Sequence, residues 1–252
     1  MNKGTVQSLG LNPLPRSKSL QEMAYESLKA GILAGRLIPG KKYGELELAR
    51  ELGISRTPVR EALLKLEAEN LVCFNPGRGI SVKYFTKKDL EDLTELRWLI
   101  EDAAVAKIGG CLSTDQIERI EHILAEQEKC VRGNYDESIF LEIDRKFHLS
   151  LIEASGNKFM IQTYNSIRDY FAMTFRGALS KKGRVIEVLR EHRLIVKALS
   201  ESNVDMAIDA VRTHLINSKS IAMSYHDAYA NNRTPPGVAV DESIEFDSEN
   251  QR

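Results

Sequence analysis

Three histidines and one aspartate in the second half of the 252-residue chain are of the types that bind divalent metal ions. Asp144 and His148 are four residues apart in DRKFH, so a helix places them on one face. His192 and His214 lie in EHRLIVKAL and VRTHL, each among apolar neighbours. Neutral imidazoles with a carboxylate suit Zn, Ni, Mn or Fe. Spacing alone leaves open the alternative of three unrelated histidines, each hydrogen bonded to a carbonyl or a carboxylate.

A second group of candidate residues lies in SRTPVREALLKLEAENLV, residues 55–72. Arg56 and Arg60 share one face of a helix that Ser55 can cap. Arginine at the start of such a helix can form two hydrogen bonds to a guanine edge in the major groove. The alternative is a solvated face on which Arg60 pairs with Glu61 or Glu67. The predicted DNA contacts, including a phosphate contact and two residues at a hairpin tip, are Ser55, Arg56, Thr57, Arg60, Lys65, Arg78 and Gly79.

The charge distribution favours a nucleic-acid partner for one part of the chain only. The whole chain has a formal net charge of −1, which by itself argues against such a partner. Residues 1–88, however, hold 15 Lys and Arg against 8 Asp and Glu, a net charge of +7. Residues 89–252 hold 20 against 28, a net charge of −8, and contain all five histidines. A basic part is therefore joined to an acidic part.

The basic part has the element order of a winged helix-turn-helix domain. Apolar periodicity predicts helices over about 20–34 and 45–52, and a third helix that starts after Ser55. The segments 71–74 and 80–85 flank the turn NPGRG and predict a two-stranded hairpin. We assign residues 18–86 to this DNA-binding domain and residues 1–17, which are polar and contain two prolines, to a flexible arm.

The acidic part is predicted to be entirely helical. Amphipathic segments separated by Gly, Ser, Thr and Asn signals predict six helices, over about 88–109, 114–131, 136–155, 158–178, 184–200 and 204–226. We expect a mainly α fold in which residues 87–227 form an all-α bundle of six or seven helices. The remaining residues, 228–252, are acidic and interrupted by proline, and predict a flexible tail.

The cysteines and the lack of targeting signals predict a cytoplasmic location. The three cysteines have no C-x-x-C spacing and are odd in number, which argues against a disulfide framework. The N-terminal segment lacks the apolar region of a signal peptide. No segment approaches the roughly 18 uninterrupted apolar residues of a membrane span. We therefore expect a soluble protein without a membrane partner.

The basic part resembles the DNA-binding domain of a known family. Three segments within residues 20–85 are similar to the N-terminal domain of GntR-superfamily bacterial transcription regulators. They are ILAGRLIPG, ELELARELGISRTPVREALLKLEAENLV and GRGISV. The segment SRTPVREAL is highly specific to that domain. The resemblance implies DNA contacts from Ser55, Arg56, Thr57 and Arg60, with Gly79 in the wing. Some members have a basic residue where this chain has Leu46, so that contact is not transferred.

The acidic part resembles the FCD domain of the FadR-type branch of the same superfamily. The similarity rests on DRKFHLSLIEASGNKFM and EHRLIVKALSESNVDMAIDAVRTHL, and covers about residues 90–225. It implies a divalent metal, with Zn favoured, held by Asp144, His148, His192 and His214. It also implies a small organic acid as effector. The main candidate for binding the effector is Arg97, for which an ion pair with Glu101 is an equal alternative. Asn165 and Arg168 are weaker candidates.

These observations predict a ligand-responsive transcription regulator that is not an enzyme. We expect a homodimer that binds a palindromic double-stranded operator, acts as a repressor and responds to a carboxylate. The main alternative is a metal-dependent hydrolase fused to a DNA-binding module. That alternative lacks support from a G-x-S-x-G, P-loop or H-E-x-x-H motif. A third interpretation makes the metal purely structural.

Overall fold

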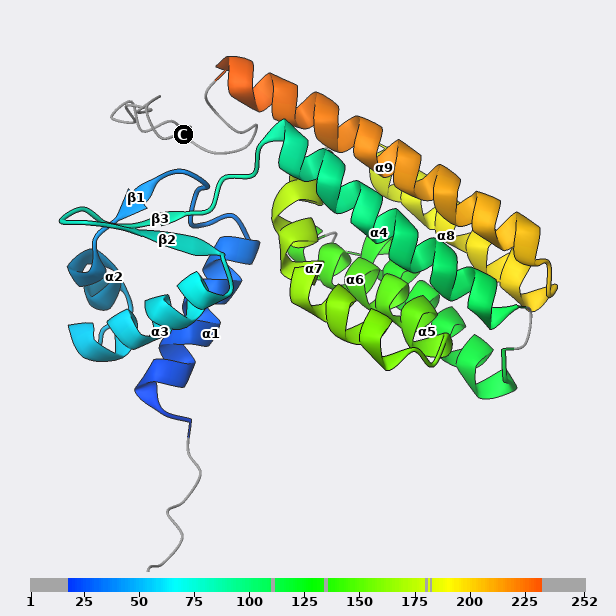
Figure 1. Ribbon diagram of the computed structural model, residues 1–252, viewed down its shortest axis with the longest axis horizontal. Helices are drawn as coiled ribbons and strands as arrows, with labels where there is room; N and C mark the ends of the chain where they lie inside the picture. The colour runs from blue at the N-terminus through cyan, green and yellow to red at the C-terminus, as the bar shows by residue number, and fades with distance from the viewer. Residues whose placement is uncertain (1–17, 110–111, 134–135, 180, 182, 233–252) are drawn as a thin grey trace, which may run out of the picture. The chain divides into compact units, whose positions relative to one another are not determined.

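The computed structural model describes residues 18–109, 112–133, 136–179, 181 and 183–232 (Figure 1). The predicted arm, residues 1–17, and the tail from residue 233 lie outside the described residues. The chain divides into two units, which comprise Met1–Ala30 with Lys42–Ser81, and Gly31–Lys41 with Val82–Arg252. The mainly α fold predicted from the sequence is confirmed, and the strands of the described residues form one small sheet.

The first unit contains three helices and a three-stranded sheet. The helices are α1 (Leu20–Leu33), α2 (Glu45–Glu51) and α3 (Arg56–Ala68). The strands β1 (Lys42–Tyr43), β2 (Val72–Asn75) and β3 (Gly79–Val82) form a sheet in the order β1-β3-β2. The predicted two-stranded hairpin is therefore incomplete, because β1 pairs antiparallel with β3 through Lys42 opposite Ser81. A strand of two residues is too short to produce a periodic signal in the sequence.

Two glycines adopt backbone conformations in this unit that other residues rarely adopt. Gly53 follows α2 with a φ of 65°, a left-handed conformation that suits glycine at the end of a helix. Gly79 has a φ of 79°, and a Cβ at this position would lie 2.2 Å from the carbonyl oxygen of Tyr43. Glycine is therefore required at the start of β3 by the close approach of β1 within the same unit.

Within the described residues, the second unit is a bundle of six helices. They are α4 (Lys87–Ile108), α5 (Thr114–Arg132), α6 (Glu137–Ala154), α7 (Lys158–Leu179), α8 (Arg184–Ser200) and α9 (Val204–Asn232). Helix α9 packs beside both α4 and α8, and α5 packs beside α6 (Figure 1). The predicted bundle is confirmed, although α9 continues to Asn232, into the segment expected to be a flexible tail.

Side-chain caps set the starts of several of these helices, and those at Thr86 and Ser113 follow the sequence signals. Thr86 accepts a hydrogen bond from the Asp89 backbone, Ser113 from that of Gln116, and Asp136 from those of Ser138 and Ile139. The apolar faces behind these caps form the interior of the bundle, which includes Phe140, Phe147, Leu151, Ile195 and Val211, all fully buried. Within the described residues, no helix has the length and apolarity needed to cross a membrane.

Candidate metal centre and nucleic-acid interface

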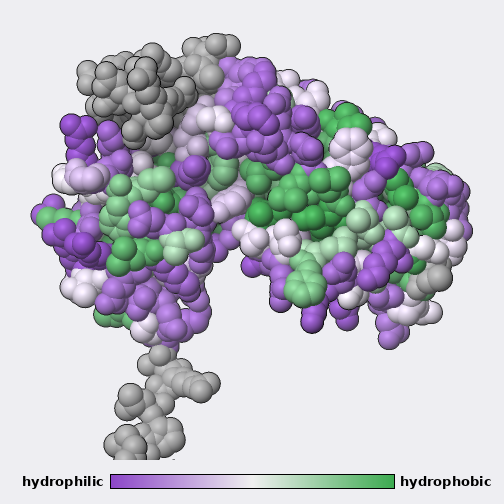
Figure 2. Space-filling view, viewed as in Figure 1, coloured by the Kyte–Doolittle hydropathy of each residue, from purple (hydrophilic) through white to green (hydrophobic). Residues whose placement is uncertain are grey.

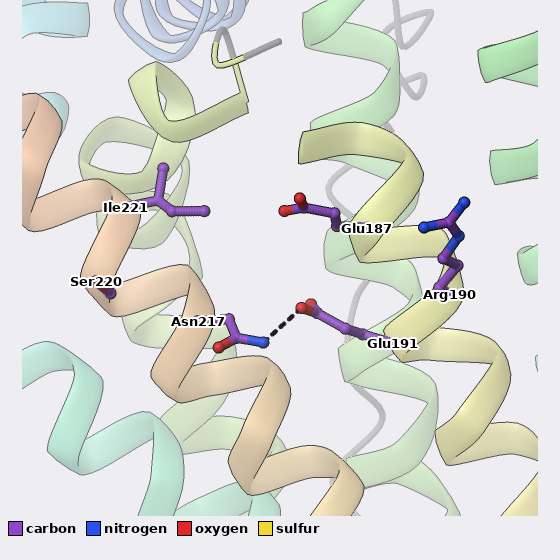
Figure 3. A pocket seen from close by; sticks show the side chains of 6 residues that line it. All are labelled: Glu187, Arg190, Glu191, Asn217, Ser220 and Ile221. Atoms are coloured by element: carbon purple, nitrogen blue, oxygen red, sulfur yellow. Dashed lines mark hydrogen bonds between the residues drawn. The ribbon is translucent and has the colours of Figure 1, made fainter. Parts of the chain in front are cut away.

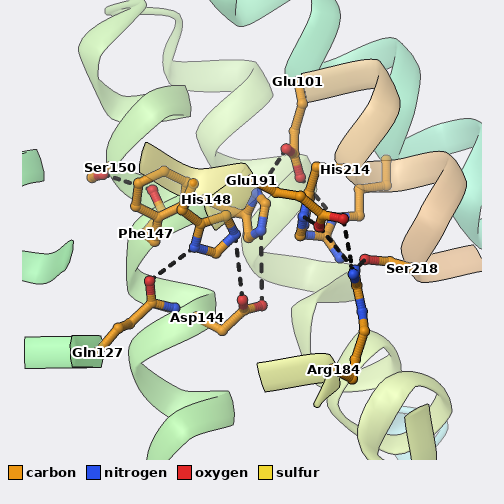
Figure 4. A network of polar contacts seen from close by, with 12 residues as sticks. Glu101, Gln127, Asp144, Phe147, His148, Ser150, Arg184, Glu191, His214 and Ser218 are labelled. Carbon is orange, nitrogen blue, oxygen red and sulfur yellow. Dashed lines mark hydrogen bonds and ion pairs between the residues drawn. The ribbon is translucent and has the colours of Figure 1, made fainter. Parts of the chain in front are cut away.

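Three histidines from three helices meet inside the second unit. His148 on α6, His192 on α8 and His214 on α9 each offer one ring nitrogen, and these nitrogens all lie within 4.8 Å of one another. The side chains are at most 2% exposed. Figure 4 shows the rings of His148 and His214 in this cluster, together with the residues around them. The structure thus brings together residues that are 66 positions apart in the sequence, as a shared metal site requires.

Asp144 completes this cluster from the same helix as His148. Its carboxylate oxygens lie 3.6 Å from Nε2 of His192 and 3.8 Å from Nε2 of His148. These distances are too long for hydrogen bonds. They are close to the separation of roughly 3 to 4 Å between atoms that share one ion with bonds of 2.0–2.2 Å. In the described part of the chain, Nε2 of His148 and of His192 are buried without a hydrogen-bond partner. The four residues therefore fit a divalent metal.

The other ring nitrogen of each histidine already has a partner. Nδ1 of His148 lies 2.8 Å from Glu101 Oε2, and Nδ1 of His214 lies 2.7 Å from Glu191 Oε2. Nδ1 of His192 lies 2.8 Å from Gln127 Oε1. Because these oxygens accept hydrogen bonds, each Nδ1 donates, and the lone pair of each ring is on Nε2. The stacked ring of Phe147, 4.0 Å away between centroids, also holds His192 in place.

The electrostatics of the cluster favour the neutral forms of His192 and His214 and the ionised form of Glu101. Burial lowers the pKa of His192 well below its usual value, with the neighbouring His214 and His148 adding to the effect. Burial also lowers the pKa of His214, although its hydrogen bond to Glu191 opposes this. Burial alone would raise the pKa of Glu101, but the adjacent His148 and Arg97 outweigh it and lower that pKa to about 2. Neutral imidazoles are the form that binds a metal.

The predicted effector residues lie in two different environments. Arg97 is 4% exposed and donates from Nε to Glu101 at 2.7 Å, so the ion pair considered from the sequence is present. Its Nη2 is buried without a hydrogen-bond partner among the described residues. Arg168 instead donates to Asn165 at 3.1 Å. Among the contacts described, none joins Arg168 or Asn165 to the histidines.

A polar cleft between α8 and α9 adjoins the cluster. It has a volume of about 450 Å³ and is lined by Glu187, Arg190, Glu191, Asn217, Ser220 and Ile221. Figure 3 shows Glu187 pointing toward Ile221 and Glu191 pointing toward Asn217 across the cleft, while Arg190 is directed away. Asn217 donates to Glu191 at 2.8 Å. The carboxylate that holds His214 is therefore also part of the wall of this cleft.

The predicted DNA contacts lie at the start of α3 in the first unit. The side chains of Arg56 and Arg60 are 61% and 60% exposed. Arg56 donates from Nε to Glu45 Oε2 at 2.5 Å, and Arg60 lies 4.0 Å from the same carboxylate. The ion-pair partner is thus Glu45 on α2, and not Glu61 or Glu67 as the alternative supposed. Ser55 occupies the N-cap position without a side-chain capping bond, and Thr57 is exposed.

The remaining DNA candidates are also on the surface of the first unit. Lys65 is exposed, with its Nζ 3.7 Å from the centre of the Tyr25 ring. Arg78 is exposed in the turn between β2 and β3. Gly79 begins β3, where its conformation is explained by the contact with β1. A nucleic-acid role for Gly79 is therefore not needed to account for the glycine.

Several residues at the cluster were missed by the sequence analysis. Gln127 gave no signal at all, because it is a single amide in an amphipathic helix. Glu191 also gave no signal, because on a helix it points away from the adjacent His192; it contacts His214 instead. His226, which lies outside the cluster, likewise gave no signal in the sequence. It is half-buried and lies 3.0 Å from the Tyr84 hydroxyl and 3.2 Å from the Phe85 carbonyl. Helix contacts of this kind cannot be derived from spacing within one helix.

Two family models match the chain. Residues 20–82 match the model described as bacterial regulatory proteins, gntR family, and residues 92–217 match the FCD domain. An uncharacterized HTH-type transcriptional regulator of Bacillus subtilis, YdhC, is 29% identical over 75% of this chain and 85% of its own length. A probable D-xylose utilization operon transcriptional repressor of Paenarthrobacter nicotinovorans is 28% identical over 73% and 80%.

Solved structures support the same architecture. The solved structure of "a putative transcriptional regulator GntR from Rhodococcus sp. RHA1" aligns with this chain with a TM-score of 0.70 at 21% identity. The alignment covers 82% of this chain and 99% of that one. At this level of identity, the likeness establishes the fold and does not identify a ligand.

Proposed function

Because the chain belongs to the gntR family of bacterial regulatory proteins and carries an FCD domain, it is a transcriptional regulator, and we propose that it is a metal-dependent, effector-controlled repressor. The observation that carries the proposal is the cluster of three buried histidines, His148, His192 and His214, beside Asp144. The other unit of the same chain exposes Arg56 and Arg60. A regulator of this kind meets its operator in the bacterial cytoplasm, where we place it.

The DNA-reading surface is the N-terminal end of α3. Arg56 and Arg60 would contact base edges in the major groove, supported by Ser55 and Thr57. Arg78 and Gly79 in the turn and strand β3 would lie along the adjacent backbone, and Lys65 would contact phosphate. Exposure of both arginines supports this role, because side chains that read DNA must be accessible before it binds.

The metal would be held by Nε2 of the three histidines and by the Asp144 carboxylate. Nitrogen and oxygen donors of this kind suit Zn best, with Ni, Mn or Fe also compatible. When bound, the ion supplies a Lewis-acidic centre that attracts a carboxylate. Two buried donors near the cluster, Nη2 of Arg97 and Nε2 of Gln127, have no hydrogen-bond partner among the residues that the structure describes. They are suited to receive the oxygens of a small organic acid. Asn165 and Arg168 are weaker candidates for the same ligand.

A homodimer is supported by the outer face of α4. This face carries apolar residues at a helical spacing, namely Leu96, Leu99 and Ala103. Leu99 is 64% exposed. Trp98 beside them is 40% exposed. Figure 2 shows hydrophobic side chains gathered on the surface over α4. An apolar surface of this kind favours a protein contact, and two copies would present two recognition helices to a palindromic operator.

A melting screen tests the proposal. The full-length protein, loaded with Zn or stripped with a chelator, is heated with each member of a panel of carboxylic and sugar acids. We expect metal to raise the melting temperature, and one class of acid to raise it further only in the loaded protein. The same acid should release the protein from a duplex selected from a random pool. Stabilisation by metal with no response to any acid would contradict effector control and leave a structural metal.

A further inference from the structure

We propose that Glu101, Gln127 and Glu191 are positioning residues that present the three histidines to the metal, and that the neutral amide of Gln127 sets the affinity of the site below its possible maximum. The inference rests on the proposed metal centre and deepens it. It assigns a role to three residues that are not themselves metal ligands and that come from α4, α5 and α8.

The contacts of these residues determine which nitrogen faces the ion. Each one contacts a histidine Nδ1 at 2.7–2.8 Å, and Gln127 is fully buried. An ionised carboxylate can only accept, so the proton of the imidazole must be on Nδ1. The tautomer with a free Nε2 lone pair is therefore chosen before a metal arrives. Without these partners a buried imidazole could carry its proton on Nε2, where it would oppose the ion.

The charge of each carboxylate is balanced by its own arginine. Glu101 accepts from Arg97 at 2.7 Å. Glu191 accepts from Nη1 and Nη2 of Arg184 at 2.8 and 3.0 Å, and Arg184 is only 1% exposed. Arg184 also donates to Ser218 at 2.8 Å. Two chains of the form Arg–Glu–His thus reach the cluster, and each is electrically neutral before the ion binds.

Gln127 breaks this pattern because it is uncharged. Its Oε1 accepts from His192, and its Nε2 is buried without a hydrogen-bond partner among the described residues. A carboxylate makes the imidazole that it contacts more basic, and hence a stronger ligand, than an amide does. A glutamate here would strengthen His192 as a ligand, but it would be buried without a balancing arginine. Gln127 therefore lowers the metal affinity of the site but keeps the metal-free protein more stable than a glutamate would.

His192 allows this electronic role to be separated from simple packing. Its ring is stacked on the fully buried ring of Phe147, so replacing Gln127 leaves a contact that keeps the ring in place. His214, in contrast, depends on Glu191, which also contacts Arg184 and Asn217. Loss of the Glu191 charge should thus have a larger effect than loss of the Gln127 amide.

The test measures Co²⁺ binding to the full-length protein by competition with a chelator, together with the visible absorption spectrum of the bound Co²⁺. Glu191→Gln is expected to weaken Co²⁺ binding by about 10- to 100-fold and to change the spectrum. Gln127→Met should weaken it by no more than about tenfold. Gln127→Glu should tighten it while lowering the melting temperature of the chelated protein. The matched control is Glu137→Gln, which removes a half-buried carboxylate 3.5 Å from Arg176 on another part of the bundle.

The outcomes separate this inference from the proposed function. If the unaltered protein binds no Co²⁺, the metal centre itself is wrong, and the inference falls with it. If it binds Co²⁺ but the Glu191 and Gln127 variants change neither the affinity nor the spectrum beyond the control, only the positioning role is wrong. A loss of melting temperature with an unchanged Co²⁺ spectrum would show a merely structural role. Should Glu191→Gln fail to fold, the opposite shifts expected for the two Gln127 variants decide the question alone.

Discussion

Arg56 and Arg60 at the start of α3 are exposed and contact one carboxylate, whereas His148, His192 and His214 are buried and each has a dedicated partner. The two sites therefore incur the cost of desolvation at different times. The DNA surface must lose water and exchange ion pairs when it binds. The histidine cluster has lost its water during folding, so its geometry exists before the ligand arrives.

This difference predicts that the histidine cluster is the less tolerant of substitution. The double variant His192→Ala, His214→Ala removes two of the four proposed ligands. Metal affinity should therefore fall by more than the roughly 100-fold expected when a residue that only positions a histidine is lost. Elemental analysis after dialysis measures the stoichiometry, which should approach zero. His122→Ala is the matched control, since His122 is 74% exposed and outside the cluster. An unchanged metal stoichiometry in the double variant would contradict the proposed metal centre.

The same difference explains what could be predicted from the sequence. The proposed recognition helix is contained in one segment, so the shared face of Arg56 and Arg60 was visible from spacing alone, although the expected side-chain cap from Ser55 does not form. The pair Asp144 and His148 was visible for the same reason. The third and fourth proposed ligands, His192 and His214, required the resemblance to a family, because 66 positions separate His148 from His214. Glu101, Gln127 and Glu191 reach the cluster only through helix packing, which the periodicity of single helices does not determine. Glu45 was missed for the same reason, since it contacts Arg56 from another helix.

The exposed site should respond to substitution through discrimination between sequences. Arg56→Ala is expected to weaken binding to a duplex selected from a random pool by about 1–3 kcal/mol and to lower its preference over unrelated DNA. Lys65→Ala should weaken binding to all duplexes alike and reduce the salt dependence by about one unit of slope. Fluorescence anisotropy at several salt concentrations measures both quantities. If Arg56→Ala leaves the preference for the selected duplex intact, α3 has been assigned the wrong role.

Acid should act on the buried site first. His192 and His214 have pKa values lowered by burial, so protonation favours the unfolded chain, whose histidines titrate near 6.5. Their contribution to stability is complete above about pH 6.5 and is lost as the pH falls toward their folded pKa values. The loss is at most about 1.4 kcal/mol per pH unit for each histidine. Glu191 stays ionised in this range because burial, which raises its pKa, is outweighed by hydrogen bonds from His214 and Arg184 that lower the pKa to about 2.

The single tryptophan makes this measurement specific to the second unit. Trp98 lies on α4, so its fluorescence during denaturant unfolding reports the bundle and not the DNA-binding unit. The chelated protein should lose stability between pH 6.5 and pH 5.5, and the metal-loaded protein should resist this loss, because the ion competes with protons for the histidines. Equal unfolding free energies of the chelated protein at the two pH values would contradict the neutral, buried state of these rings.

The smallest expected effect concerns Glu45, the one acidic contact of the recognition arginines that we describe. Its side chain is 9% exposed, and its carboxylate holds Arg56 at 2.5 Å. Glu45→Gln removes a negative charge beside the DNA surface, so binding to unrelated DNA should rise by about three- to tenfold. Binding to the selected duplex should rise less, because Arg56 is no longer held in one orientation. Glu51→Gln, which removes an exposed charge from the end of the same helix, is the control. If both variants raise all affinities equally, the Glu45 carboxylate contributes only charge, and the exposed site has no preorganisation comparable to that of the buried one.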